Sequence, residues 1–213
     1  MGWKLAIFAF PKSDVTKASV VKSIYGKKAA LQSSEETFEA ALYPQNDKLP
    51  RILEFGQHIL LLDWDLIIKA ADPLSLNVAT YSSYVLQSTV NWYGFTVVRE
   101  GCLIRQRHGT SDDGVQVHEG LPLDIELQAI KQLAKPDDAA SLLQIWQRGV
   151  GSAKVENEYG AFEIDQSSMG EDIVFALMET ELGYRLDKSS TQSHALLEKT
   201  VDHIKKPKRF FIF

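Results

Sequence analysis

The sequence has a single cysteine, Cys102, among its 213 residues. No disulfide can form within the chain, so packing alone must hold the core, and a chain of this length can bury enough surface for that. One thiol suits a reducing compartment, and we therefore expect a cytoplasmic protein. Cys102 follows Gly101 and is interpreted as an ordinary thiol in a hairpin turn, because a catalytic thiol needs a neighbour that stabilises the thiolate.

The chain also lacks a long apolar run and an excess of basic residues. No segment reaches the roughly 18 consecutive apolar residues of a membrane-spanning helix, and the N-terminal apolar run ends at Pro11 without a signal-peptide pattern. The net charge is −5, whereas a protein that binds nucleic acid normally carries a basic face. We therefore expect neither a membrane nor a nucleic-acid partner.

The common local signatures of catalysis are missing as well. The sequence contains no phosphate-binding P-loop, no dinucleotide-binding glycine motif, no serine elbow, no zinc-protease motif and no CxxC pair. We therefore expect no cofactor, although an active site can exist without a local motif.

What is present is a pattern of short strands and amphipathic helices. Apolar periodicity predicts strands over 3–10, 51–55, 58–62, 84–90, 92–99, 103–107 and 115–118, and helices over 13–25, 34–42, 66–71, 124–134, 136–149, 168–183 and 193–205. Short glycine-containing turns between the central strands favour an antiparallel meander. We expect a single α+β domain over residues 1–213, with helices packed on a mainly antiparallel sheet. The apolar segment 210–213 is interpreted as a final strand in that sheet, or alternatively as a peptide buried in a partner.

Two basic side chains on the central hairpin are candidates for binding. Arg105 and Arg107 alternate along one strand, so both guanidinium groups would face the same side and could meet one anionic ligand. Trp92 and Tyr93 would point to opposite faces of the neighbouring strand. An exposed Trp92 beside the two arginines would make a recognition surface, although a solvated sheet face explains the same pattern.

A second candidate is a metal site in the segment 108–119. A hairpin could bring His108 and His118 together, with Asp113 from the turn between them, and imidazole with carboxylate is a competent set for a divalent cation. The alternative is a solvated turn, for which Asp-Gly is a favourable sequence. Asp63 and Asp65 could likewise bind a cation or act as a base, or one of them could cap the following helix.

Several short motifs carry a resemblance to a known family. They are Met1-Gly2 at the start, Leu42-Tyr43-Pro44, the strand Ser88 to Tyr93 with its Trp92, Gly101 followed by Leu103-Ile104-Arg105, Asp113-Gly114, Gly120-Leu121-Pro122 with Glu126, and Gly183-Tyr184. In these motifs the chain resembles an uncharacterised family of bacterial proteins, mainly from actinobacteria, whose domain has no known function. The resemblance implies a strand order but no activity, substrate or catalytic residue.

These observations lead to three functional hypotheses. The first is a non-catalytic binding or interaction domain that contacts a protein partner or a second copy of itself. The alternative is a metal-assisted hydrolase that activates water with the His and Asp residues of segment 108–119. The third is a sensor of a small anion that uses the arginines.

Overall fold

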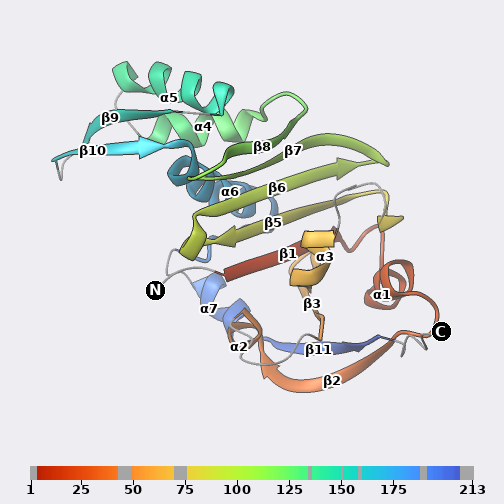
Figure 1. Cartoon of the computed structure of the whole chain (residues 1–213). Coiled ribbons are helices and arrows are strands. Elements are labelled where there is room, and N and C mark those ends of the chain that lie inside the picture. The colour runs from red at the N-terminus through yellow and green to blue at the C-terminus, as the bar shows by residue number, and fades with distance from the viewer. Residues whose placement is uncertain are drawn as a thin grey trace.

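The computed structural model describes residues 4–42, 49–69, 76–133, 136–149, 151–157, 160–187 and 191–206. Figure 1 shows the elements of these residues along the chain. In chain order they are β1 Lys4–Pro11, α1 Lys17–Tyr25, β2 Ala30–Thr37, α2 Phe38–Leu42, β3 Arg51–Phe55, β4 His58–Leu62, α3 Trp64–Lys69, β5 Tyr81–Gln87, the 3-10 turn η2 Ser88–Val90, β6 Trp92–Arg99, β7 Cys102–Thr110, β8 Gly114–Glu119, α4 Asp124–Leu133, α5 Pro136–Arg148, β9 Ser152–Asn157, β10 Gly160–Asp165, α6 Gln166–Leu182, α7 Thr191–Leu197 and β11 Thr200–Lys205.

Nine of the strands form one sheet in the order β2-β11-β3-β4-β1-β5-β6-β7-β8. Every neighbouring pair in this sheet is antiparallel. Strands β5 to β8 follow one another in sequence and in space, so the predicted α+β fold with a central antiparallel meander is confirmed. Strands β9 and β10 form a separate hairpin, and β2 and β8 lie at the two edges of the large sheet.

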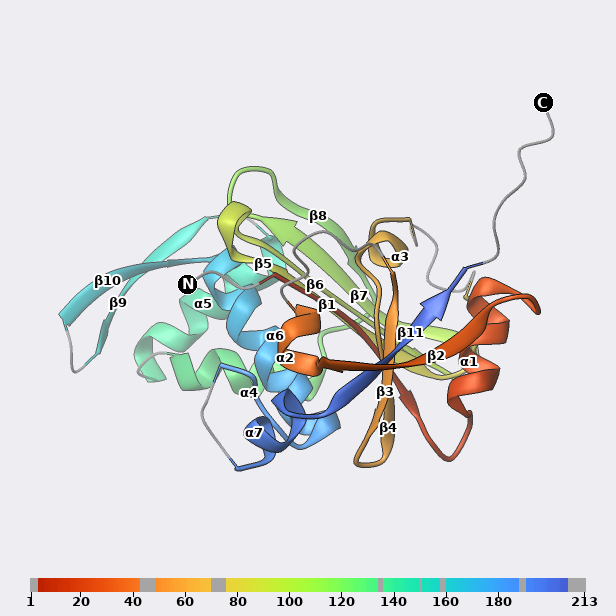
Figure 2. The ribbon, with the colours of Figure 1, turned by 90° about the horizontal axis from the view of Figure 1, so that it is seen from below.

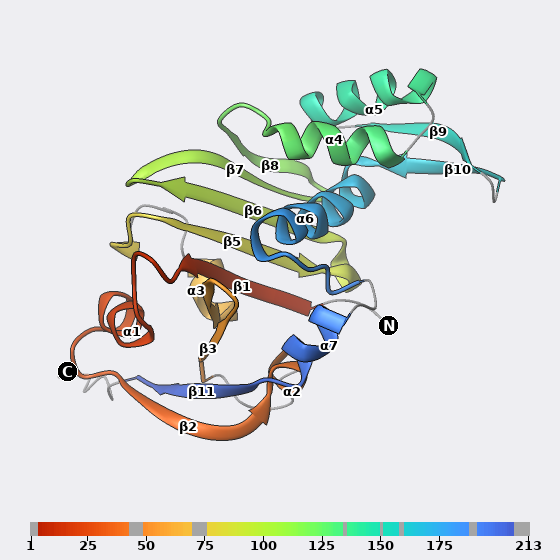
Figure 3. The ribbon, with the colours of Figure 1, turned by 180° about the vertical axis from the view of Figure 1, so that it is seen from behind.

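Each face of the sheet has its own hydrophobic core. Figure 3 shows α6 lying across one face, with α4 and α5 beyond it. This core contains Trp146 of α5, Met169 of α6 and Tyr93 of β6, together with α2 and α7 residues. The opposite face is covered by Val20 and Val21 of α1 and by the partly buried Trp64 of α3, which Figure 2 shows on the other side of the strands. Successive side chains of the central strands therefore point alternately into the two cores, and each core is covered by helices.

Two helices begin at other residues than the sequence predicts, in each case next to a side chain that caps the helix. Helix α1 begins at Lys17 rather than Ser13, because Thr16 and Ser19 form a reciprocal capping box. Helix α6 begins at Gln166, since the Asp165 side chain accepts from the backbone N–H groups of Ser167 and Ser168.

Two sequence predictions are wrong, each because strand pairing overrides the local pattern, and one hairpin was missed. The predicted helix over 34–42 is a helix only from Phe38, since residues 30–37 pair with β11. The predicted helix over 193–205 ends at Leu197, and the residues after it form β11 between β2 and β3. The hairpin of β9 and β10 was not predicted.

The segment 210–213, predicted as a strand, lies outside the described residues. Within the described part of the chain, no helix is both long and apolar enough to cross a membrane.

Candidate functional site

Arg105 and Arg107 lie on β7, on the face that helices α4, α5 and α6 cover. Both residues have 0% of their surface exposed. The interpretation as a solvated sheet face is therefore wrong, and the alternative, a surface on which both guanidinium groups meet an anion from solvent, does not have the exposure it needs. The strand alternation was correct, but the helices that follow in the chain pack over this part of the sheet and exclude solvent from both guanidinium groups.

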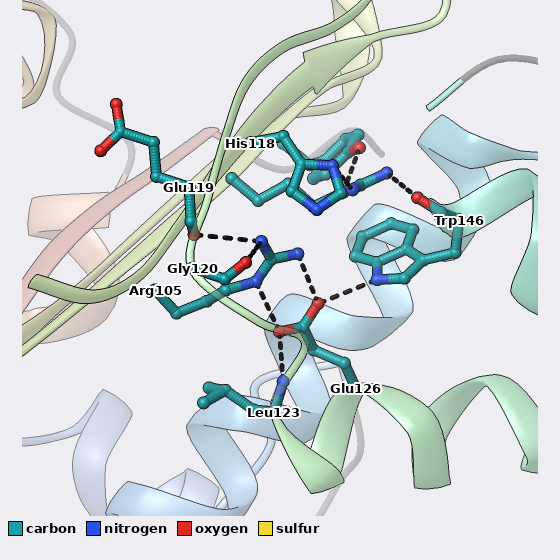
Figure 4. Close-up of polar contacts among 9 residues, drawn as sticks. Arg105, His118, Glu119, Gly120, Leu123, Glu126 and Trp146 are labelled. Carbon is teal, nitrogen blue, oxygen red and sulfur yellow. Dashed lines mark hydrogen bonds and ion pairs between the residues drawn. The ribbon is translucent and has the colours of Figure 1, made fainter. Parts of the chain in front are cut away.

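Arg105 forms a two-point ion pair with Glu126, the third residue of α4. Its Nε lies 2.8 Å from Glu126 Oε1 and its Nη2 lies 3.0 Å from Oε2, as Figure 4 shows. Neither side chain is exposed. Such a parallel pair of charge-assisted bonds fixes both position and orientation, so it anchors the first turn of α4 to β7.

The same two side chains hold the loop between β8 and α4. Arg105 Nη1 donates to the carbonyl oxygens of Glu119, at 3.1 Å, and Gly120, at 2.9 Å. At the other end of the loop, the backbone N–H of Leu123 donates to Glu126 Oε1 at 2.8 Å. Residues 119–123, here called the 119–123 loop, are thus bonded at both ends to one buried ion pair (Figure 4).

Gly120 permits this close approach. Its φ is +78°, and a Cβ at this position would lie 2.1 Å from the carbonyl oxygen of Ile104. Both the backbone angle and the contact exclude a side chain. The next residue, Leu121, is 84% exposed, and Ile104 is 41% exposed.

Arg107 extends the polar contacts to α5. Its guanidinium carbon lies 3.6 Å from the centre of the Trp146 ring, and its Nη2 donates to the Trp146 carbonyl at 2.7 Å. Nε donates to Tyr93 Oη at 3.2 Å, and Nη1 lies 3.0 Å from His118 Nδ1. Because arginine only donates, His118 Nδ1 accepts this bond. These partners are all neutral, and burial lowers the pKa of Arg107 from its ordinary value.

Trp146 joins the two arginines into one network, because its Nε1 donates to Glu126 Oε2 at 2.8 Å. We call Tyr93, Arg105, Arg107, Glu126 and Trp146 the buried polar cluster. Its ionic groups are two guanidinium groups and one carboxylate, a combination that is stable only when the remaining donors are well bonded.

The cluster continues to α6 through Tyr93. Tyr93 Oη donates to Gln166 Oε1, and Gln166 Nε2 donates to the Thr110 carbonyl. Gly170 of α6 packs directly on the Tyr93 ring, where a Cβ would lie 2.3 Å from a ring carbon. Burial raises the pKa of Tyr93, so its hydroxyl keeps its proton. The cluster therefore ties α4, α5 and α6 to the sheet near β8.

The predicted metal site does not assemble. His118 pairs across the strands with Arg107, and His108 pairs with Val117, so the two imidazoles project from opposite faces of the sheet. Asp113 is exposed in the turn, where its N–H donates to Thr110 Oγ1. The described residues contain no group of three or more side chains that could hold a metal ion, and the hairpin prediction failed because it ignored strand alternation.

His108 instead fills a space on the face opposite the buried polar cluster. A Cβ at Gly94 would lie 2.5 Å from His108 Nδ1, so this glycine makes room for the ring. His108 Nε2 is buried and has no hydrogen-bond partner among the residues that the structure describes, and burial lowers the pKa of His108 to about 4. The ring is therefore neutral at pH 7.

The remaining candidates have structural roles. Asp63 is buried, accepts from the Leu66 N–H at 3.1 Å and from Tyr25 Oη at 2.6 Å, and so caps α3 as the alternative interpretation expected. Trp92 is partly buried and packs edge-on against Trp64, with ring centres 5.7 Å apart, on the face away from the arginines. It therefore forms no surface with Arg105 and Arg107.

Glu126 and Trp146 are the cluster members that were not singled out from the sequence. No local pattern pointed to either residue, because each lies on a helix far from β7 in the sequence. Comparison of the chain with protein-family models, with curated proteins and with solved structures gave no match.

Proposed function

We propose that this protein is a cytoplasmic binding domain that contacts a protein partner through the 119–123 loop. The observation that carries this proposal is the pairing of a rigid backbone with an exposed apolar side chain. Leu121 is 84% exposed, although it lies between residues that are bonded to a fully buried ion pair.

Rigidity favours binding because the loop has little conformational entropy left to lose. Ordering a flexible loop or side chain opposes association by an amount comparable with a good contact. Here the Gly120 carbonyl and the Leu123 N–H are already fixed, and Pro122 restricts the backbone between them.

The chemistry of the loop indicates the kind of surface it fits. Leu121 follows a glycine that lies against the backbone of Ile104, and Ile104 is itself partly exposed. Two exposed apolar side chains on adjacent backbone segments match an apolar pocket on a partner protein. In this arrangement the buried polar cluster positions the loop and does not touch the partner.

The test is a comparison of two surface variants. Leu121→Ser removes the exposed apolar group, and Val90→Ser does the same at η2, where Val90 is 50% exposed. Each purified protein is immobilised, incubated with a lysate of the organism that encodes it, and analysed by quantitative mass spectrometry. We expect at least one partner whose recovery falls about tenfold with Leu121→Ser and is unchanged with Val90→Ser.

Both variants should unfold within about 0.5 kcal/mol of the wild type, because the substitutions lie on the surface. A partner set that is the same for the wild type and Leu121→Ser contradicts the proposal. So does a wild-type protein that retains no protein above the blank resin.

A further inference from the structure

Basic side chains gather where strand β11 ends. Strands β2 and β11 pair with Ala30 opposite Lys205, so the turn before β2, which carries Lys27 and Lys28, lies beside the last residues of β11. Figures 1 and 3 show α1 next to this end of the two strands. We call this surface the basic end and define it by five exposed side chains, Lys22 of α1, Lys27, Lys28, Lys205 and Lys206.

Most of this positive charge is not neutralised within the described part of the chain. Lys206 Nζ lies 3.2 Å from the buried carboxylate of Asp63 and 5.1 Å from the centre of the Tyr25 ring. The other four lysines of the basic end make no ion pair with another residue that the structure describes. The neighbouring Asp202 is already paired with Lys17, at 2.6 Å, so it does not offset them.

The sequence continues the same chemistry after β11. Residues 205–209 read Lys-Lys-Pro-Lys-Arg and residues 210–213 read Phe-Phe-Ile-Phe, of which 207–213 lie outside the described residues. Two more cations therefore follow the basic end directly, and four large apolar side chains follow them. Because Asp63 and Tyr25 hold Lys206, this segment begins beside the basic end.

The surface of an anionic lipid bilayer matches both halves of this pattern. Anionic headgroups attract clustered lysine and arginine side chains, and the boundary below the headgroups accepts aromatic and aliphatic side chains. A nucleic acid is the other common polyanion, but proteins that bind single strands combine a basic groove with aromatic side chains on which successive bases stack. Here the cations and the apolar residues form two successive blocks, which correspond to two depths of a bilayer surface.

The net charge of −5 led to the expectation that the chain has no membrane partner. Charge is screened over about 8 Å at physiological salt, so the side chains that face a surface decide whether they are attracted to it. The acidic residues elsewhere on the chain therefore do not cancel the basic end.

We infer that the basic end and segment 207–213 bind the surface of an anionic lipid bilayer. The lysines lie at the level of the headgroups, and the apolar side chains of 210–213 enter the boundary below them. Stable attachment of a peripheral protein generally needs an apolar anchor together with a basic patch, because either signal alone is weak. The binding is therefore reversible, and it depends on both anionic lipid and low salt.

The experiment is cosedimentation of the full chain with two kinds of vesicle, phosphatidylcholine alone and an equal mixture of phosphatidylcholine and phosphatidylserine. We expect at least about tenfold stronger binding to the mixed vesicles, and release at high salt. The double variant Lys27→Glu/Lys28→Glu should bind the mixed vesicles at least about tenfold more weakly than the wild type.

A matched control separates the basic end from the charge of the whole protein. Lys131→Glu/Lys154→Glu makes the same change of net charge at exposed lysines of α4 and β9. We expect this variant to bind the mixed vesicles like the wild type. Equal weakening by the two double variants would overturn the inference, because the attraction would then come from net charge and not from the basic end.

The apolar half is tested with the triple variant Phe210→Ser/Phe211→Ser/Phe213→Ser. It should bind the mixed vesicles at least about tenfold more weakly and unfold at the same temperature as the wild type. A lower unfolding temperature would show that the segment packs within the fold, which overturns the inference. So would a wild type that does not sediment with the mixed vesicles, that binds both kinds equally, or that binds duplex DNA and neither kind of vesicle.

Discussion

The two edges of the sheet are built from different chemistry. On β7, the strand next to the β8 edge, Arg105 and Arg107 are buried under helices, and Arg105 is paired with Glu126 of α4. On β2, at the other edge, Glu35 is exposed and makes no ion pair with another described residue. The β8 edge is also partly occupied, because the Val115 N–H donates to the Gly149 carbonyl after α5, at 3.3 Å.

This contrast shows how the same residue types serve opposite purposes. Arg105 and Glu126 have no exposed surface, so their pairing decides whether the local fold exists. Lys28 and Glu35 are exposed, so their charges contribute little to folding. The comparison therefore separates charged residues that the fold depends on from charged residues that contribute little to stability, and substitutions can test each side.

The largest effect is expected from removing the buried carboxylate. Glu126→Gln keeps the shape of the side chain but leaves two buried guanidinium groups without a counter-ion. We expect the free energy of unfolding, measured with urea, to fall by about 3–5 kcal/mol, as when one partner of a buried ion pair is lost.

Glu35→Gln is the matched control at the other edge. It makes the same chemical change on an exposed residue, so we expect a difference from the wild type within about 0.5 kcal/mol. Equal losses for the two variants would show that burial of the Arg105–Glu126 pair does not distinguish the edges.

On the opposite face of β7 from the two arginines, protonation of the buried His108 should lower the stability of the fold. The folded-state pKa of His108 is about 4, below the ordinary value of 6.5. As pH falls, the unfolded chain takes up the proton first, so stability present above pH 6.5 is lost between pH 6.5 and pH 4. The loss from this residue is at most about 3 kcal/mol.

His108→Leu should remove that part of the pH dependence, and it breaks no hydrogen bond of Nε2 to another described residue. The measurement is the difference in urea unfolding free energy between pH 7 and pH 4, for the variant and the wild type. His194→Leu, at an exposed position of α7, is the control and should keep the wild-type difference. A His108→Leu variant with an unchanged pH dependence would mean that protonation of this ring does not oppose folding.

Much of the sheet could be predicted from the sequence because its central strands are local. The hairpins 51–62 and 92–107 join neighbouring strands through short glycine-containing turns, so their pairing needs no distant information. Strand β11 is different. In the sequence, Val201 and Ile204 have the spacing of one face of a helix, but in the structure they lie on a strand that pairs with β2 on one side and β3 on the other. Long-range pairing overrode a local pattern there.

The site was predicted less well for a related reason. Alternation correctly placed Arg105 and Arg107 on one face of β7, but exposure depends on what covers that face. The covering helices lie later in the chain, and Glu126 reaches Arg105 across 21 positions. A pattern within one strand cannot distinguish a solvated pair of arginines from a buried pair whose carboxylate comes from another element.

The smallest expected effect is the difference in stability between alanine substitutions at two glycines, Gly120 and Gly101. This difference tests how tightly the 119–123 loop is held against its neighbours. Gly120 and Gly101 have nearly the same backbone angle, with φ of +78° and +75°. An added Cβ would meet nothing within 4 Å at Gly101, but would lie 2.1 Å from the Ile104 carbonyl oxygen at Gly120. Alanine should therefore cost about 1 kcal/mol at Gly101, from backbone strain alone, and roughly 2 kcal/mol more at Gly120.

The same two glycine variants should also differ in partner binding. Gly120→Ala can fold only if the loop moves away from Ile104, which would also displace the Gly120 carbonyl from Arg105 and release Leu121 from its fixed position. We therefore expect this variant to lose the partner that Leu121→Ser loses, while Gly101→Ala retains it, in the same recovery assay. If Gly120→Ala is destabilised but keeps that partner at the wild-type level, the rigidity of the loop contributes to folding and not to recognition, and an exposed leucine on a mobile backbone would be sufficient for binding.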